Sequence, residues 1–218
     1  MDIGGMFMEV KAIMCDVDGT LLTSEQVVSP FTVEMIKQAR EQGILFGLST
    51  GRDMNSVKKL LNVWGIEGLV DVIVGTGGSE NYDYRLDTFQ SNYPLDGELN
   101  KLIIICDEDY MDKVIERSIT FHNDRFKSSS LKTVSELYEY MDPRVTKING
   151  LIKAIGVHGI DIKEIVTFGD ADNDYDMTLN AGVSVVMEMA VKKQRVLQMQ
   201  LLMIITMMVL EIIFKNIS

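Results

Sequence analysis

Short apolar runs alternate with helix-forming segments in this chain, and this rhythm limits its fold more than any other feature. The runs lie at residues 8–15, 44–49, 69–74, 164–169 and 183–187. Each run is too short for a typical helix. Its side chains are mostly apolar at both odd and even positions, as expected of strands that helices cover on both faces. We therefore predict an α/β fold, a Rossmann-like parallel sheet with helices on both faces.

The rhythm changes after Ser79. Residues 80–99 are mostly polar and aromatic, and an apolar run at 102–106 and a helical pattern at 111–122 follow. We therefore expect a discontinuous core of residues 1–78 and 144–187, interrupted by a small inserted α/β unit at 79–143.

The charge balance excludes several classes of partner. Lys+Arg 21 against Asp+Glu 32 gives a net charge of −11, with an isoelectric point near 4.7. Such a chain repels phosphate backbones and anionic lipids, so we expect no nucleic-acid partner and no membrane partner. Two cysteines are too few for a disulfide scaffold, and the first residues lack the pattern of a signal peptide. We therefore expect a cytoplasmic protein.

Chemically active residues follow three of the predicted strands. Asp16 and Asp18 come directly after the first strand, Thr50 after the second, and Asp170 after a later one. Lys147 lies just before a helix of the core. Right-handed crossovers bring the carboxyl ends of parallel strands to one edge of the sheet, where ligands bind. These side chains are therefore predicted to meet.

Carboxylates gathered at one edge repel each other unless a cation lies between them. Oxygen ligands of this kind favour Mg²⁺. The hydroxyl of Thr50, nearby backbone N–H groups and the ammonium of Lys147 are suited to hold a phosphoryl group. The pattern thus predicts a magnesium site beside a phosphate site.

The segments DVDGT, STGR and GDADND, together with Lys147, resemble the four motifs of the haloacid dehalogenase-like (HAD) superfamily of phosphohydrolases. The residues of these segments are most similar to those of the Cof-type sugar-phosphatase branch. The resemblance covers residues 10–187. It implies an α/β cap in place of the inserted unit. It also implies a Mg²⁺-dependent phosphatase that acts on a small phosphorylated metabolite, a sugar phosphate or a phosphorylated cofactor, through an aspartyl-phosphate intermediate.

The resemblance also implies residue roles. Asp16 would be the nucleophile, and Asp18 would protonate the leaving alcohol and then activate water. Thr50 would bind a phosphoryl oxygen, and Lys147 would neutralise charge between Asp16 and the phosphoryl group. The implied metal ligands are Asp16, the backbone carbonyl of Asp18, Asp170 and Asp174, the last directly or through water. The implied substrate contacts are Thr50, Gly51, Arg52 and Asn173.

Two alternative functions stay open at this point. A phosphotransferase or phosphomutase would use the same Asp16 and Asp18 pair. A damaged chain without catalysis would keep the motifs with an impaired cap and tail. The insert of about 65 residues is short for a cap of this branch, and Thr76 stands where relatives usually have Asn.

The last residues, 188–218, depart from the rest of the chain. They contain no Gly or Asp, and a run that is apolar except for Thr206 occupies 201–210. Codons read one base out of phase after Met187 would encode Gly, then Asn or Asp, then Gly, as relatives have. We therefore interpret this aberrant tail as the product of a frameshift. The alternative is a membrane anchor, which needs about 20 apolar residues, more than this run supplies.

Overall fold

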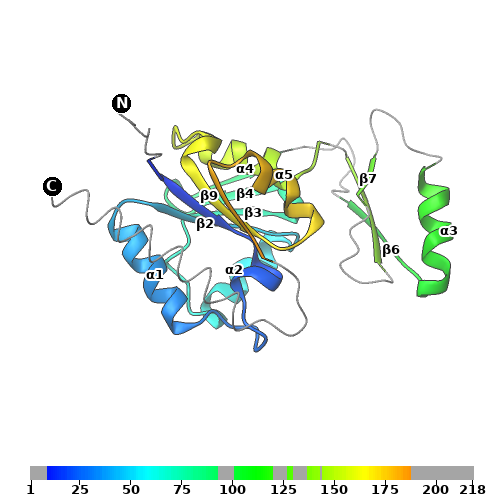
Figure 1. The fold of residues 1–218 in the computed structure, drawn as a ribbon, viewed down its shortest axis with the longest axis horizontal. Coiled ribbons are helices and arrows are strands. Elements are labelled where there is room, and N and C mark those ends of the chain that lie inside the picture. The colour runs from blue at the N-terminus through cyan, green and yellow to red at the C-terminus, as the bar shows by residue number, and fades with distance from the viewer. Residues whose placement is uncertain (1–8, 93–100, 120–126, 130–136, 143, 188–218) are drawn as a thin grey trace, which may run out of the picture.

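The computed structural model describes residues 9–92, 101–119, 127–129, 137–142 and 144–187. Figure 1 shows a twisted sheet with helices on both faces, and a smaller sheet with one helix beside it. This arrangement confirms the predicted α/β fold. The frameshifted or anchoring tail at 188–218 lies outside the described residues. Within them, no helix combines the length and apolar character that crossing a bilayer requires.

Five of the seven strands of the larger sheet are parallel and adjacent, in the order β10-β9-β1-β2-β3, with β10 at one edge. They are β1 (Ala12–Cys15), β2 (Leu45–Ser49), β3 (Val72–Gly75), β9 (Ile165–Gly169) and β10 (Val183–Val186). Each corresponds to one of the predicted apolar runs. Because all five are parallel, their carboxyl ends lie along one edge of the sheet.

Helices cover the two faces of this sheet in pairs. They are α1 (Pro30–Glu41) and α2 (Met54–Val63) on one face, and α4 (Lys147–Gly156) and α5 (Tyr175–Asn180) on the other. Side chains along a strand alternate between faces, so Ile13 and Cys15 pack with α1 and α2. Ala12 and Met14 pack with α4 and α5. This double burial explains why β1 and β3 are apolar throughout, whereas β10, at the edge of the sheet, is mostly exposed.

Side chains of Ser29 and Asp53 cap the first turns of two core helices. The Oγ atom of Ser29 accepts a hydrogen bond from the backbone N–H of Thr32, with Pro30 as the first residue of α1. The Oδ1 atom of Asp53 accepts one from the N–H of Ser56 at the start of α2. The Asp53 cap starts α2 four residues after β2 ends, which keeps the link containing Thr50 short.

The core sheet extends beyond residue 78, where the sequence analysis placed the start of the insert. Strands β4 (Glu80–Asp83) and β5 (Thr88–Ser91) form an antiparallel hairpin that continues the sheet from β3. The hairpin is polar because it lies at the sheet edge, where Asn81 and Asp83 point inward and all of β5 is exposed. We therefore propose that the core continues through the hairpin and that the insert begins after it.

A second sheet has three antiparallel strands in the order β6-β8-β7. They are β6 (Lys101–Ile105), β7 (Lys127–Ser129) and β8 (Leu137–Met141), and helix α3 (Glu108–Ile119) packs against them. Met111 of the helix and Tyr138 of β8 are both buried. The apolar run at 102–106 and the helical pattern at 111–122 therefore correspond to β6 and α3. We propose this α/β unit as the cap.

Asp71 ties three parts of the core together at the edge opposite the carboxyl ends. Its carboxylate accepts hydrogen bonds from Arg40 of α1, from Arg85 in the β4–β5 turn and from the backbone N–H of Phe46 in β2. Burial alone would raise the pKa of Asp71, but the hydrogen bonds from Arg40 and Arg85 hold it below its usual value. The ionised carboxylate therefore stabilises the fold.

We expect Asp71→Asn to lower the free energy of unfolding at pH 7 by about 2 kcal/mol, because it removes the charged acceptor of Arg40, Arg85 and the N–H of Phe46. The lowered pKa means that this contribution is complete above about pH 4 and is lost as the pH falls through the folded-state pKa. Urea unfolding of both proteins at several pH values measures it. The exposed Glu41→Gln is the matched control and should cost under about 0.5 kcal/mol. An equally small effect of Asp71→Asn would contradict this account.

Candidate active site

Lys147 lies at the centre of the candidate site. Its Nζ donates a hydrogen bond to Oδ1 of Asp16 at 2.5 Å and to Oδ1 of Asp174 at 2.6 Å. Asp16 follows β1 and Asp174 precedes α5. Lys147 is the first residue of α4, so this helix begins one residue earlier than the sequence predicted. All three side chains are buried. The fold thus brings together three side chains that are up to 158 residues apart in sequence.

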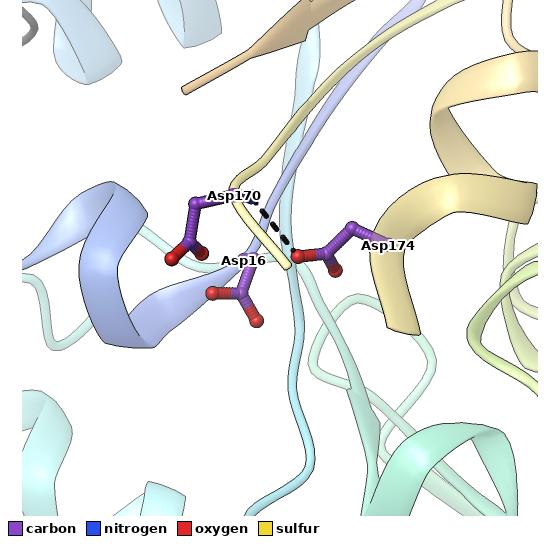
Figure 2. Close-up of side chains that lie close together, drawn as sticks. All are labelled: Asp16, Asp170 and Asp174. Atoms are coloured by element: carbon purple, nitrogen blue, oxygen red, sulfur yellow. Dashed lines mark hydrogen bonds between the residues drawn. The ribbon is translucent and has the colours of Figure 1, made fainter. Parts of the chain in front are cut away.

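A third carboxylate, that of Asp170, completes the acidic group. Figure 2 shows Asp16, Asp170 and Asp174 turned toward one another, and one oxygen of each lies within 4.8 Å of the others. The backbone N–H of Asp170 also donates to Oδ2 of Asp174 at 3.1 Å. The loop after β9 is therefore folded back so that the side chains of Asp170 and Asp174 face Asp16.

The turn after β1 shapes the other wall of this site. The hydroxyl of Thr20 donates to Oδ1 of Asp170 at 2.9 Å. Gly19 has a φ of +83°, and a Cβ there would lie 2.3 Å from Oδ2 of Asp170. Only glycine fits a left-handed turn pressed against a carboxylate. Sequence analysis gave Thr20 no role, although it is the last residue of the DVDGT motif.

Burial sets the protonation chemistry of the group. It raises the pKa of Asp16 to about 7, although the ammonium of Lys147 opposes the shift. Burial also raises the pKa of Asp170, against the hydrogen bond from Thr20. For Lys147, burial acts to lower the pKa, but the charges of Asp16 and Asp174 outweigh it and raise the pKa. The site therefore holds its lysine charged and carries more negative charge than that lysine balances.

This donor set fits a divalent cation. When all three carboxylates are ionised, they and the one ammonium leave an excess of two negative charges, which is what one Mg²⁺ would cancel. Hard oxygen ligands are the ones that Mg²⁺ prefers, and no sulfur or imidazole belongs to this acidic group. The residues present are thus suited to the predicted metal.

Asp18 lies outside the acidic group, at the surface. Its two oxygens accept hydrogen bonds from Nε of Arg52 at 2.8 Å and from Nη2 at 2.5 Å, and the Asp18 side chain is 48% exposed. The guanidinium of Arg52 also lies 5.5 Å from the ring centre of Trp64. The predicted acid–base residue and a predicted substrate contact are therefore paired with each other at the solvent side of the site.

The loop after β2 carries the remaining phosphate contacts that were predicted. Thr50 is buried, its Oγ1 accepts a hydrogen bond from the N–H of Arg52, and Gly51 is half-buried between them. The loop after β3 is fastened to it: the N–H of Thr76 donates to the carbonyl of Arg52, and that of Gly77 to the carbonyl of Thr50. Two strand-end loops thus form one bonded unit.

Asn173 lies in the turn between Asp170 and Asp174. Its side chain is half-buried, and its Oδ1 is buried without a hydrogen-bond partner among the described residues. An unpaired buried amide oxygen costs free energy. The Oδ1 atom of Asn173 is therefore a buried acceptor, in the same loop as Asp170 and Asp174, that no described residue satisfies.

Comparison with known proteins places this geometry in a family. The sequence pattern of the haloacid dehalogenase-like hydrolases matches residues 13–84 and 78–198. A phosphoglycolate phosphatase of Sulfolobus acidocaldarius is 22% identical over 192 residues, which cover 81% of this chain and 83% of that protein.

Solved structures share the fold. A haloacid dehalogenase-like hydrolase from Bacteroides thetaiotaomicron superposes with a TM-score of 0.68 at 18% identity, covering 87% of this chain and 92% of that one. A subclass IIB sugar phosphatase of the same superfamily superposes with a TM-score of 0.62 at 17% identity, covering 86% and 91%. Since the family match spans both parts of the core, this chain belongs to the haloacid dehalogenase-like hydrolases, as its motifs indicated.

Proposed function

We propose that this protein is a Mg²⁺-dependent phosphatase that hydrolyses a small phosphorylated metabolite through an aspartyl-phosphate on Asp16. The observation that carries the proposal is the position of Lys147, which lies within 2.6 Å of both Asp16 and Asp174 in a group of three carboxylates. A carboxylate attacks a phosphate dianion only when positive charge offsets their repulsion. This site supplies one such charge and has the ligands for a second.

Asp16 is the nucleophile in this proposal. One of its carboxylate oxygens forms a bond to phosphorus as the bond from phosphorus to the alcohol oxygen breaks. Lys147 holds Asp16 in place and offsets the charge that gathers on the phosphoryl oxygens. Thr50, beside it at the end of β2, binds a phosphoryl oxygen through its hydroxyl.

Asp18 acts in this proposal as the general acid and then as the general base. It gives a proton to the departing alcohol oxygen, and then takes one from the water that attacks phosphorus and releases Asp16 and free phosphate. Both of its oxygens accept from Arg52 in this structure, so the ion pair must open first. Arg52 then becomes free to bind the substrate. Asn173 is a second proposed substrate contact, through an amide oxygen that no described residue uses.

The residues that would hold Mg²⁺ are Asp16, the backbone carbonyl of Asp18, Asp170 and Asp174. Both oxygens of Asp174 already accept hydrogen bonds, from Lys147 and from the N–H groups of Asp170 and Ala171. Its contact with the ion is therefore best made through a water. When bound, the cation supplies charge neutralisation and orients the phosphoryl group.

The proposed substrate is a small phosphorylated metabolite, as the family resemblance implies. The names of similar proteins, a phosphoglycolate phosphatase and a sugar phosphatase, support this class. The negative net charge and the two unpaired cysteines support a cytoplasmic location.

We expect Asp16→Asn to lower kcat for an aryl phosphate at least about 1000-fold, because an amide is not a nucleophile toward phosphorus. Release of free phosphate from wild type and variant, in the presence of Mg²⁺, measures this. Asp176→Asn is the matched control, since that side chain is exposed on α5, and it should keep full activity. Full activity of Asp16→Asn would refute the assignment.

The same assay separates hydrolysis from phosphoryl transfer. With a sugar phosphate as substrate, a phosphatase releases one phosphate per sugar, whereas a mutase yields an isomerised sugar phosphate without free phosphate. We expect stoichiometric release of phosphate by the wild-type protein. An isomerised product would overturn the hydrolase assignment while leaving Asp16 as the nucleophile.

We expect Mg²⁺ at about 100 times its Kd to stabilise the wild-type protein by about 2.7 kcal/mol at pH 8. Protons compete for Asp16, whose pKa is raised to about 7, so the apparent affinity should fall about tenfold per pH unit below that value. Thermal unfolding with and without Mg²⁺ measures both effects. Asp170→Asn should lose the stabilisation and Asp176→Asn should keep it; equal midpoints with and without Mg²⁺ for the wild type would contradict the metal site.

A further inference from the structure

The position of the Lys147 side chain depends closely on where helix α4 begins. It begins α4, and the side chain of Thr146 caps the helix by accepting a hydrogen bond from the N–H of Asn149. Two contacts of 2.5 and 2.6 Å hold its ammonium between two carboxylates. A shift of the first turn of α4 would therefore move the ammonium away from at least one of them.

That first turn packs directly on the loop after β3, backbone against backbone. A Cβ at Gly150 would lie 2.6 Å from the Cα of Gly78 and 2.7 Å from a methyl group of Val74. A Cβ at Gly78, whose φ is +108°, would lie 2.0 Å from the carbonyl oxygen of Thr146. Neither position has room for a side chain, so the two glycines set how closely α4 approaches the sheet.

The β4–β5 hairpin fastens this contact with two buried amides. Nδ2 of Asn81 donates to the carbonyl of Gly150 at 3.1 Å, and Nδ2 of Asn92 donates to the carbonyl of Gly78 at 2.9 Å. Lys153, one turn further along α4, donates to the carbonyl of Asn92 at 2.8 Å. Asn81 and Asn92 therefore bind the backbone of Gly150 and of Gly78, the two glycines that are in contact.

We propose that Asn81, Asn92 and the contact between Gly78 and Gly150 are positioning residues for Lys147. This inference rests on the proposed function, because it assigns a catalytic purpose to a part of the core that touches no reacting atom. In this proposal the polar hairpin fixes the position of the first turn of α4 through these hydrogen bonds. A displacement of about 1 Å in such a group is enough to cost about 100-fold in rate.

The test compares two glycines of one helix. We expect Gly150→Ala to lower kcat about 10- to 100-fold. Gly156→Ala should stay within about twofold, because a Cβ there meets no atom within 4 Å. Circular dichroism and thermal unfolding verify that both variants fold. Wild-type kcat in folded Gly150→Ala would overturn the proposal.

A double-mutant cycle separates positioning from general damage to the structure. If Gly150 acts through Lys147, Gly150→Ala should change the kcat of Lys147→Ala less than about twofold. An undiminished loss in that background would show a structural role and overturn the proposal. Should Gly150→Ala fail to fold, Asn81→Ala takes its place in the cycle, with the exposed Asn62→Ala as its control.

Failure of the inference and failure of the proposed function look different. A wild-type protein without phosphatase activity refutes the function, and a crystal structure of Gly150→Ala, or of Asn81→Ala, then decides the inference alone. A distance between Nζ of Lys147 and Oδ1 of Asp16 beyond about 3.5 Å supports it. A distance that stays at 2.5 Å overturns it.

Discussion

One buried ammonium among three carboxylates is the interaction on which the arrangement of this core depends. Lys147 needs Asp16 and Asp174 in order to stay charged away from water, and they need it in order to lie so close together. The parallel sheet supplies Asp16 and Asp170 at its carboxyl edge, and α4 supplies the lysine from one face. A site of this kind fits a divalent cation, which would balance its excess negative charge.

The two edges of the sheet serve different purposes. At the carboxyl edge, charge is crowded and the pKa of Asp16 is raised by burial. At the opposite edge, Asp71 is neutralised by two arginines and its pKa is lowered. The two carboxylates differ because Asp71 has two guanidinium partners, whereas Asp16 shares one ammonium with Asp174.

Much of the core could be predicted from the sequence because β1, β2 and β9 are buried runs that each end at a polar motif, as Ile13 and Asp16 illustrate. The hairpin β4–β5 was missed because edge strands need not be apolar, and Asn81 and Asn92 carry no motif. The pairing of Asp18 with Arg52 was also not foreseen, because side-chain contacts between two motifs depend on how their loops fold. Residue roles came from the family resemblance, and the structure adds their distances.

The most direct measurement is chemical trapping of the proposed intermediate during turnover. Borohydride reduces an acyl phosphate to an alcohol and so converts a phosphorylated aspartate into homoserine. Peptide mass spectrometry after trapping should find homoserine at position 16, only when substrate and Mg²⁺ are both present. Homoserine at position 18 or 170, or none at any position during rapid phosphate release, would contradict Asp16 as the nucleophile.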